Sequence, residues 1–473
     1  MAIDQITTGV IKDNAVTAAK IPAGAIEIAD VADDAITSAK IAAGAVDATA
    51  LGTGAVGTAK IAADAIDGTK LADNAVNSEH VTAGAIDTAH IGDDQVTGAK
   101  IENNPTIAGN LAVTGKTTLT GDFIPATAYN HRNVIYNGGM QIYQRGSGAP
   151  ATNNGGFALD RWRYSTWGAP GVVTVTQDSD IPSGQGFSSS LKMDVTTADA
   201  SPAAGDSNGI SMKFEGQDLQ RFAKGVSGAK ASTVSFWVKS PKTGVHIVWL
   251  YDNDNNRSIS KSYTIASANT WENHSVTFAG DTTGAWGNDV NESAQLTFIT
   301  MAGTDASSGT LATSWESYTA ANRAVGQVNC MDNTANNFYL TGVQWELGSN
   351  ATPFEHRRYG DELMACRRYY QTWGGNSTHE RLAVGYGAGG SQVRCDIPLI
   401  PTMRTTPTLS VSSNGDWKVE GDNYAPTVTG IGLDQASPKI AATNFNASVA
   451  SGEGSHIIGN NTTAARFNLS AEL

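Results

Sequence analysis

The sequence is poor in cysteine, in charged residues and in long apolar runs, and each shortage excludes a class of protein. Its 473 residues include 3 cysteines without CxxC spacing, so we expect free thiols rather than disulfides or a structural zinc. Charged residues make up 16%, too few for a coiled coil or a disordered chain. No apolar run is long enough to span a bilayer, and the first residues, MAIDQITTG, lack the basic start and apolar core of an export signal.

Basic clusters and catalytic motifs are also missing. The formal net charge is −14, which argues against a nucleic-acid partner and against an anionic membrane surface, because both bind a basic face. No GxSxG, HExxH, P-loop or dinucleotide fingerprint occurs in the sequence. We therefore expect a protein that is not an enzyme, does not bind nucleic acid and does not insert into a membrane.

A decapeptide array fills residues 11–100, in nine copies. The first position is aliphatic, the sixth is Val or Ile, and the fourth is always Asn, Gly or Asp, as in Asn14, Gly24 and Asp34. Apolar residues five apart share no face of an α-helix, and on a straight strand they alternate between faces, so the chain must bend between them. Asn, Gly and Asp tolerate the left-handed backbone that such a bend requires.

A single copy of the array cannot bury enough apolar surface to offset the entropy of ordering it. The array therefore needs neighbours, and we predict three chains wound about a common axis as a homotrimeric stalk. A monomeric β-solenoid is the alternative, although it would favour longer strands and bulkier core residues. A disordered linker is the third interpretation, and it does not explain why nine copies stay in phase.

Aromatic residues are concentrated in the next part of the chain. Eight of the ten tryptophans fall between residues 162 and 345. Val234, Phe236 and Val238 alternate with their neighbours, which indicates a strand with one buried face, and turns rich in Gly, Asn, Asp and Ser separate such runs. This pattern over residues 131–360 is typical of a jelly-roll-like β-sandwich.

Several stretches of this region resemble known families. The opening NVIYNGGMQIYQRG, the LDRW at 159–162 and the closing FYLTGVQWELGSNATPFEHRRYGDELMACRRYYQ are similar to the heads of many phage tail fibres. The stretch TVSFWVKSPKTGVHIVWLYD, followed by NTWENHSVTF, resembles carbohydrate-binding-module sandwiches. The decapeptide array likewise resembles fibre stalks. The resemblance covers roughly residues 131–371 and implies a virion tail protein, made in the host cytoplasm, that binds a host surface polysaccharide.

Sugar binding needs aromatic faces that stack on pyranose rings and planar polar groups that bond hydroxyls. In the head we select Trp249, Tyr251, Trp271, Trp286 and Arg257 as candidate ligand-binding residues. For any one of these tryptophans a place in the core is the stronger interpretation.

Trp237 alternates out of phase with the buried residues of its strand, so it belongs to the opposite face of the sheet. That face is either a binding surface or is covered by a second layer.

Two polar motifs have a structural and a functional interpretation. Asp252, Asp254 and Asn256 have the alternate spacing of a calcium loop, but the expected Gly and the distal Glu are missing. We interpret this stretch as a polar hairpin turn and expect no cofactor, with a structural calcium as the alternative. Asp160 and Arg161 of LDRW are interpreted as an ion pair that fixes a loop, with a catalytic role as the alternative.

Beyond the head we predict a short helix at residues 361–371, which either joins three heads or packs on its own sandwich. Residues 372–473 read as short strands and are predicted to form a receptor-binding tip. Its candidate contact loops are Asn414–Tyr424, which contains the candidate residues Trp417 and Tyr424, and Gly452–His456.

The sequence thus predicts an all-β phage tail fibre adhesin that binds host glycan through many weak sites, with a tail or baseplate protein holding its N-terminus. A tailspike depolymerase and a structural tail connector are the alternatives. The expected segments are a virion-attachment end and stalk at 1–101, a β collar at 102–130, the sandwich at 131–360, the helix at 361–371 and a C-terminal β tip at 372–473.

Overall fold

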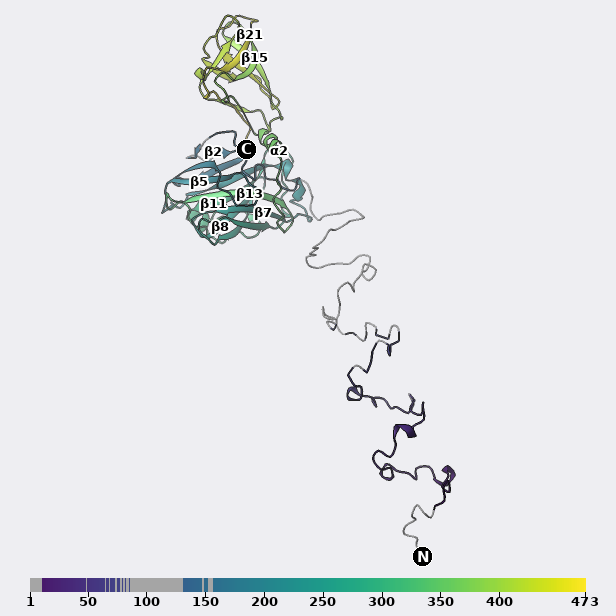
Figure 1. Ribbon diagram of the computed structural model, residues 1–473. Helices are drawn as coiled ribbons and strands as arrows, with labels where there is room; N and C mark the ends of the chain where they lie inside the picture. The colour runs from purple at the N-terminus through teal and green to yellow at the C-terminus, as the bar shows by residue number, and fades with distance from the viewer. Residues whose placement is uncertain are drawn as a thin grey trace. The chain divides into compact units, whose positions relative to one another are not determined.

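The computed structural model describes residues 11–47, most of 49–85, 131–146, 149–151 and 156–473 (Figure 1). The chain divides into two units, at residues 1–118 and 119–473. The predicted virion-attachment end at 1–10 and the predicted collar at 102–130 lie outside the described residues. Within the described part, every helix is too short or too polar to span a bilayer.

Two successive turns recur through the described decapeptides. In the first turn the fifth residue donates its backbone N–H to the carbonyl of the second, as Ala15 does to Lys12 at 2.8 Å. The fourth residue of the decapeptide, which lies within this turn, has a positive φ, 63° at Asn14 and 61° at Asp34, so the left-handed bend predicted from the sequence is present. The second turn is a short 3-10 helix: η1 Ala18–Lys20, η2 Ile28–Asp30, η3 Ser38–Lys40 and η4 Thr58–Lys60.

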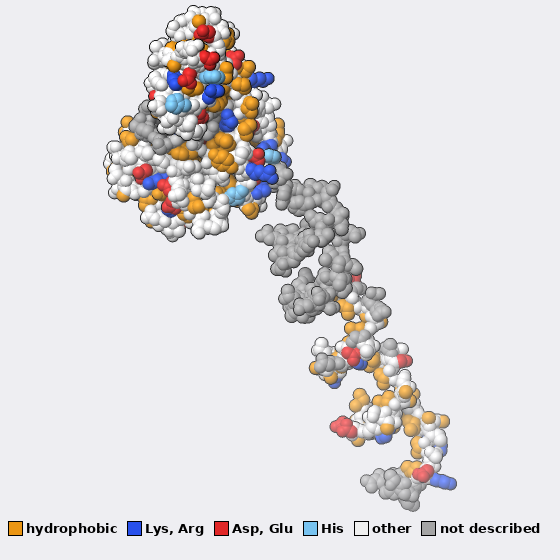
Figure 2. Space-filling view, turned by 45° about the horizontal axis from the view of Figure 1, so that its top comes forward, with side chains coloured by type: hydrophobic (Ala, Val, Ile, Leu, Met, Phe, Trp, Pro, Cys, Tyr) orange, Lys and Arg blue, Asp and Glu red, His pale blue; other side chains and the backbone are white. Residues whose placement is uncertain are grey.

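The aliphatic side chains of the array find no core within one chain. From Ile11 to Leu71 the side chains at the first position are 37–44% exposed, and from Val16 to Val76 those at the sixth position are 52–60% exposed. Figure 2 shows these hydrophobic side chains lying open along the described part of the array. Within the described residues, no second layer of the same chain buries them.

The head is an antiparallel β-sandwich, which confirms the predicted all-β fold class. Sheet A has the strand order β1-β4-β5-β13-β7-β10, and sheet B has the order β12-β9-β8-β11-β6-β3-β2. The chain passes repeatedly from one sheet to the other, as a jelly-roll-like sandwich requires. Sheet A contains β1 Ala149–Ala151, β4 Val172–Asp178, β5 Ser190–Thr197, β7 Ser232–Lys239, β10 Glu272–Phe278 and β13 Asn337–Leu347. Sheet B contains β2 Gly156–Leu159, β3 Trp162–Trp167, β6 Ser207–Glu215, β8 Gly244–Asp252, β9 Arg257–Ile265, β11 Glu292–Ala302 and β12 Glu316–Ser317.

The core between these sheets is filled by large aromatic and aliphatic side chains. Val234, Phe236 and Val238 of β7 all point into it and are fully buried, as their alternation predicted. Trp162 and Trp345 are also fully buried there. Short helical turns lie in the loops: η8 Gly216–Asp218, η9 Gln220–Phe222, α1 Thr304–Ser307 and η10 Ala320–Asn322.

The predicted helix is α2, Tyr359–Arg367, and it ends earlier than expected because Tyr370 already begins strand β14. It packs on its own head: the Glu362 carboxylate accepts the backbone N–H of Asn137, and Cys366 is fully buried. The packing of this helix on its own sandwich, one of the two arrangements considered, is therefore present.

The C-terminal domain has two sheets and a separate core. Sheet C has the order β14-β22-β17, and sheet D has the order β18-β21-β15-β16-β20-β19. Trp417, Phe445 and Phe467 are fully buried in this core. The elements are β14 Tyr370–Trp373, β15 Arg381–Gly387, β16 Gln392–Pro398, β17 Thr408–Val411, η11 Asn414–Asp416, β18 Trp417–Glu420, β19 Gly430–Leu433, β20 Ile440–Asn446, β21 Gly454–Gly459 and β22 Phe467–Ser470.

Buried ion pairs join the C-terminal domain to the head through LDRW. The structural interpretation of this motif holds, but Asp160 and Arg161 do not pair with each other. Asp160 accepts the backbone N–H of Gln144 at 2.7 Å, whereas Arg161 pairs with Glu472. Arg145 reaches the same Glu472 carboxylate at 2.7 Å. The two residues form the tight turn between β2 and β3, where Arg161 has φ 69°, and each of them finds a different partner.

Candidate functional site

The face of sheet A that is turned away from the core carries Trp237. This residue alternates with the buried Phe236 and Val238, and in register it stands opposite Asn273 of β10 and Thr341 of β13. Its ring is half-buried rather than enclosed. Of the two interpretations of this face, a second layer that covers it fully is absent from the described residues, and the ring of Trp237 keeps part of its surface exposed.

A groove of about 480 Å³ lies over Trp237. Its side chains combine aromatic rings with planar amides and the imidazole of His356. The lining includes Gln185, Phe187, Trp237, Asn273, Phe354 and His356.

A bulge in β13 makes room for the floor of this groove. The pairing of β13 with β7 shifts register between Thr341 and Gln344, and Gly342 within the bulge has φ 61°. A Cβ on Gly342 would lie 2.5 Å from the Phe187 ring and 3.1 Å from the Trp237 ring. Glycine is therefore required here both for the backbone conformation and for the approach of the two rings.

Three rings form one wall of the groove. The Phe187 ring centroid lies 5.1 Å from that of Phe354 and 5.2 Å from that of His356, and the last two are 4.9 Å apart. Phe187 is buried, Phe354 is partly exposed and His356 is exposed. Tilted and edge-on contacts of this kind hold the rings in fixed orientations.

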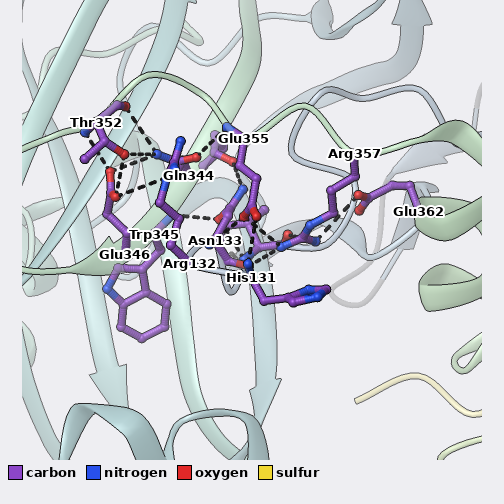
Figure 3. A network of polar contacts seen from close by, with 12 residues as sticks. His131, Arg132, Asn133, Gln344, Trp345, Glu346, Thr352, Glu355, Arg357 and Glu362 are labelled. Carbon is purple, nitrogen blue, oxygen red and sulfur yellow. Dashed lines mark hydrogen bonds and ion pairs between the residues drawn. The ribbon is translucent and has the colours of Figure 1, made fainter. Parts of the chain in front are cut away.

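Hydrogen bonds fasten the segment 352–357, which carries two of these rings, to β13 (Figure 3). The Glu346 carboxylate accepts the backbone N–H of Thr352 at 2.8 Å and its hydroxyl at 2.7 Å. The side-chain oxygen of Gln344 accepts the backbone N–H of Glu355 at 2.8 Å.

The same segment is bound from its other side by the start of the head (Figure 3). Glu355 accepts the backbone N–H groups of His131 and Asn133 at 2.8 and 3.0 Å. Arg357 donates to the carbonyls of Asn133 and Ile135. Because side chains alternate along an extended segment, Glu355 and Arg357 face this network while the residues between and before them line the groove.

Trp271, a sequence candidate, lies on the same outer face of sheet A. Its indole N–H donates to Asp180 at 2.9 Å, and the Lys239 ammonium lies 4.5 Å from the centroid of the Tyr339 ring. Lys239 follows Trp237 by two residues on β7, so the two side chains share this face. Burial raises the pKa of Asp180, but Lys239 and Trp271 outweigh this effect and hold the pKa below its usual range.

Trp249 and Tyr251 lie together on the outer face of sheet B. Their ring centroids are 5.2 Å apart, and the ring of Tyr318 lies 5.4 Å from that of Tyr251. Trp249 is buried and packs against Tyr318 and Ala324, which belong to the segment between β12 and β13. The structure therefore gives Trp249 no free ring face.

The other two head candidates have structural partners. Trp286 is buried in the core, with its ring centroid 5.7 Å from that of Phe222. Arg257 binds Asp281 through two nitrogens, at 2.8 and 3.2 Å. The sequence could not show that these two residues are occupied, because the residues that cover Trp286 and pair with Arg257 are distant along the chain.

The weak calcium candidates surround the tight turn between β8 and β9, which confirms the hairpin interpretation. Asp252 is fully buried against the Lys224 ammonium at 2.6 Å. Asp254 accepts the backbone N–H of Gly287, and Asn256 accepts the Tyr251 hydroxyl. No group of three metal-ligating side chains converges anywhere in the described ranges. The negative charge of Asp252 is thus already neutralised by a lysine.

In the C-terminal domain the two predicted contact loops do meet. The Tyr424 hydroxyl donates to the Gly454 carbonyl at 2.5 Å and lies 2.8 Å from the Ser455 hydroxyl. Trp417, however, is fully buried, with its ring centroid 6.4 Å from that of Phe467. Trp417 is therefore a core residue, and its prediction as a contact residue is wrong.

No protein-family model and no curated protein matches the chain. Among solved structures, the enzymatically active domain of tailspike protein 4 of bacteriophage CBA120 is similar at 18% identity and a TM-score of 0.25, over 46% of this chain and 22% of that chain. A putative sugar-binding protein of Bacteroides thetaiotaomicron is similar at 11% identity and TM-score 0.25, over 46% and 100% of the two chains. A family 11 carbohydrate-binding module of Clostridium thermocellum is similar at 12% identity and a TM-score of 0.22, over 45% of this chain and 98% of that chain.

Proposed function

We propose that this protein is a trimeric, non-enzymatic tail fibre adhesin of a phage, and that its head binds a host surface glycan in the groove over Trp237. The observation that carries the proposal is the combination, in one open groove, of an aromatic platform with planar amides. Trp237 would stack on the C–H face of a pyranose, and the amides of Gln185 and Asn273 would bond its hydroxyls.

The chemistry of the groove favours a neutral sugar. None of the described side chains that line it is a carboxylate, lysine or arginine. A charged sugar would find no fixed opposite charge there and would lose hydration. The same lining lacks the pair of carboxylic acids that most glycoside hydrolases use, which supports binding rather than cleavage.

The trimer is supported by the described part of the array. Side chains such as Ile26 and Ile36 keep more than half of their surface exposed, at 58% and 60%. Winding with two further copies would remove this apolar surface from water, at about 25 cal/mol per Å². Three heads on one fibre would then raise the avidity of a weak single site without any new contact.

Binding to a glycan array tests the head groove. Full-length protein should bind at least one neutral bacterial polysaccharide, and Trp237→Ala should weaken that binding by about tenfold or more. Ser275→Ala is the matched control, because Ser275 is an exposed residue of β10 outside the groove. Equal binding by wild type and Trp237→Ala would refute the assignment.

Two further measurements separate the alternatives. Light scattering of the full-length protein should give a trimer, and a monomer at dilution would remove the avidity argument. Released oligosaccharides after incubation with the bound polysaccharide would indicate a depolymerase, and failure to bind any glycan or cell would favour a structural connector.

A further inference from the structure

A second groove, of about 510 Å³, lies on the outer face of sheet D in the C-terminal domain. Its lining differs from that of the head groove because it carries charges of both signs beside one exposed aromatic ring. The lining includes Val384, Tyr386, Arg394, Asp396, Asp434 and Asn444.

Register places three of these side chains in one row across three strands. Arg394 of β16 stands opposite Tyr386 of β15 on one side and opposite Asn444 of β20 on the other. Side chains directly opposite in an antiparallel pair have Cβ atoms about 5 Å apart, so the row forms a continuous surface. Ala442, a small residue, also lines the groove.

Two polar groups of this row, the guanidinium of Arg394 and the side-chain oxygen of Asn444, lack close partners within the protein. The guanidinium of Arg394 has a contact with Asp434 at 3.7 Å, longer than a hydrogen bond. The side-chain oxygen of Asn444 is buried and accepts no hydrogen bond. Tyr386 is 53% exposed. A buried acceptor without a donor is unfavourable, so it is a position at which a bound hydroxyl gains a full hydrogen bond.

We propose that this groove is a second glycan subsite, which takes a neutral pyranose unit of the same surface polysaccharide. Tyr386 forms the stacking platform, Arg394 donates to sugar oxygens, and Asp396 and the Asn444 oxygen accept from hydroxyls. Adjacent donors and acceptors match vicinal hydroxyls, each of which donates and accepts. Two carboxylates against one guanidinium disfavour an anionic sugar or a phosphate. The proposal rests on the proposed function, since it assigns a second contact to the same adhesin.

Saturation-transfer NMR on the full-length protein tests this assignment. The probes are the methyl pyranosides of glucose, galactose, mannose and N-acetylglucosamine, with glucuronate as the anionic control. In a Trp237→Ala background, which removes the head groove, at least one neutral glycoside should still bind. Adding Tyr386→Ala or Arg394→Ala should weaken that remaining binding by about tenfold. Tyr386→Phe keeps the ring and should retain it, and Ile440→Ala, outside the groove on β20, should change nothing.

The outcomes distinguish the two proposals. Loss of binding with Tyr386→Ala but not with Trp237→Ala overturns the head site and supports this one. Loss of all binding with Trp237→Ala alone overturns this site and supports the head. This second site is also overturned if the Tyr386→Ala and Arg394→Ala variants bind like their parent. Preferential binding of glucuronate overturns it as well. Unchanged near-UV circular dichroism confirms in each case that the variant is folded.

Discussion

Glu472 should be the residue on which attachment of the C-terminal domain to the head depends most. Its carboxylate is almost fully buried and is shared by Arg161 and Arg145. Arg161 is itself buried, and its guanidinium also lies 3.5 Å from the centroid of the Tyr369 ring. Removal of the Glu472 carboxylate therefore leaves the charge of Arg161 unpaired in a buried place, whereas removal of Arg161 leaves Glu472 paired with Arg145 alone.

Breaking a buried ion pair from one side costs about 3–5 kcal/mol, because the remaining charge stays desolvated. We expect Glu472→Gln to lower the free energy of unfolding by about this amount, and Arg161→Met to lower it by less, because Glu472 keeps Arg145 as a partner. The double variant Arg161→Met with Glu472→Leu leaves neither charge of this pair, so its loss should be clearly smaller than the sum of the single losses.

Urea unfolding of the full-length protein, followed by tryptophan fluorescence, measures these changes. Hydrogen exchange in β14 and β22 should also quicken in the single variants, since these strands lie beside the ion pairs in the chain. Glu453→Gln, at an exposed turn, is the control and should change stability by less than about 0.5 kcal/mol. If Glu472→Gln matches this control, the buried pair does not hold the two domains together.

The same residue predicts a pH dependence. Burial raises the pKa of Glu472, but Arg161 and Arg145 outweigh burial and hold the pKa below its usual value of 4.5. A carboxyl whose folded pKa is depressed contributes stability above its unfolded pKa, and this contribution is lost as the pH falls through the folded pKa. Acid should thus loosen the wild type, whereas Glu472→Gln should lack this component.

Two other predictions concern the head groove and the thiols. Gly342→Ala should lower stability by about 1–3 kcal/mol and abolish glycan binding, because a Cβ there meets the rings of Phe187 and Trp237; unchanged melting and binding would contradict the role of the bulge. Burial raises the pKa of Cys330 to about 12 and that of Cys395 to about 11, so a thiol reagent at neutral pH should label them slowly until urea unfolds the protein. Rapid labelling of the native protein would show that these sites open.

Local patterns in the sequence determined the elements of this protein. Asn14 and Asp34 have the left-handed backbone that their place between two aliphatic residues required. The alternation in β7 identified which residues are buried and set Trp237 on the opposite face. These features depend on residues within a few positions of one another, so a short stretch of sequence contains all the information that decides them.

The tertiary structure alone decided which aromatic residues are open. Trp286 and Trp417 were as good candidates as Trp237 in sequence, but distant segments cover them. The groove itself is built from segments as far apart as Phe187 and Phe354, whose rings meet only when a polar network folds the end of the head back on sheet A. A periodic pattern reports the face of a strand on which a side chain lies, whereas the cover over that face comes from loops whose positions only the completed fold determines.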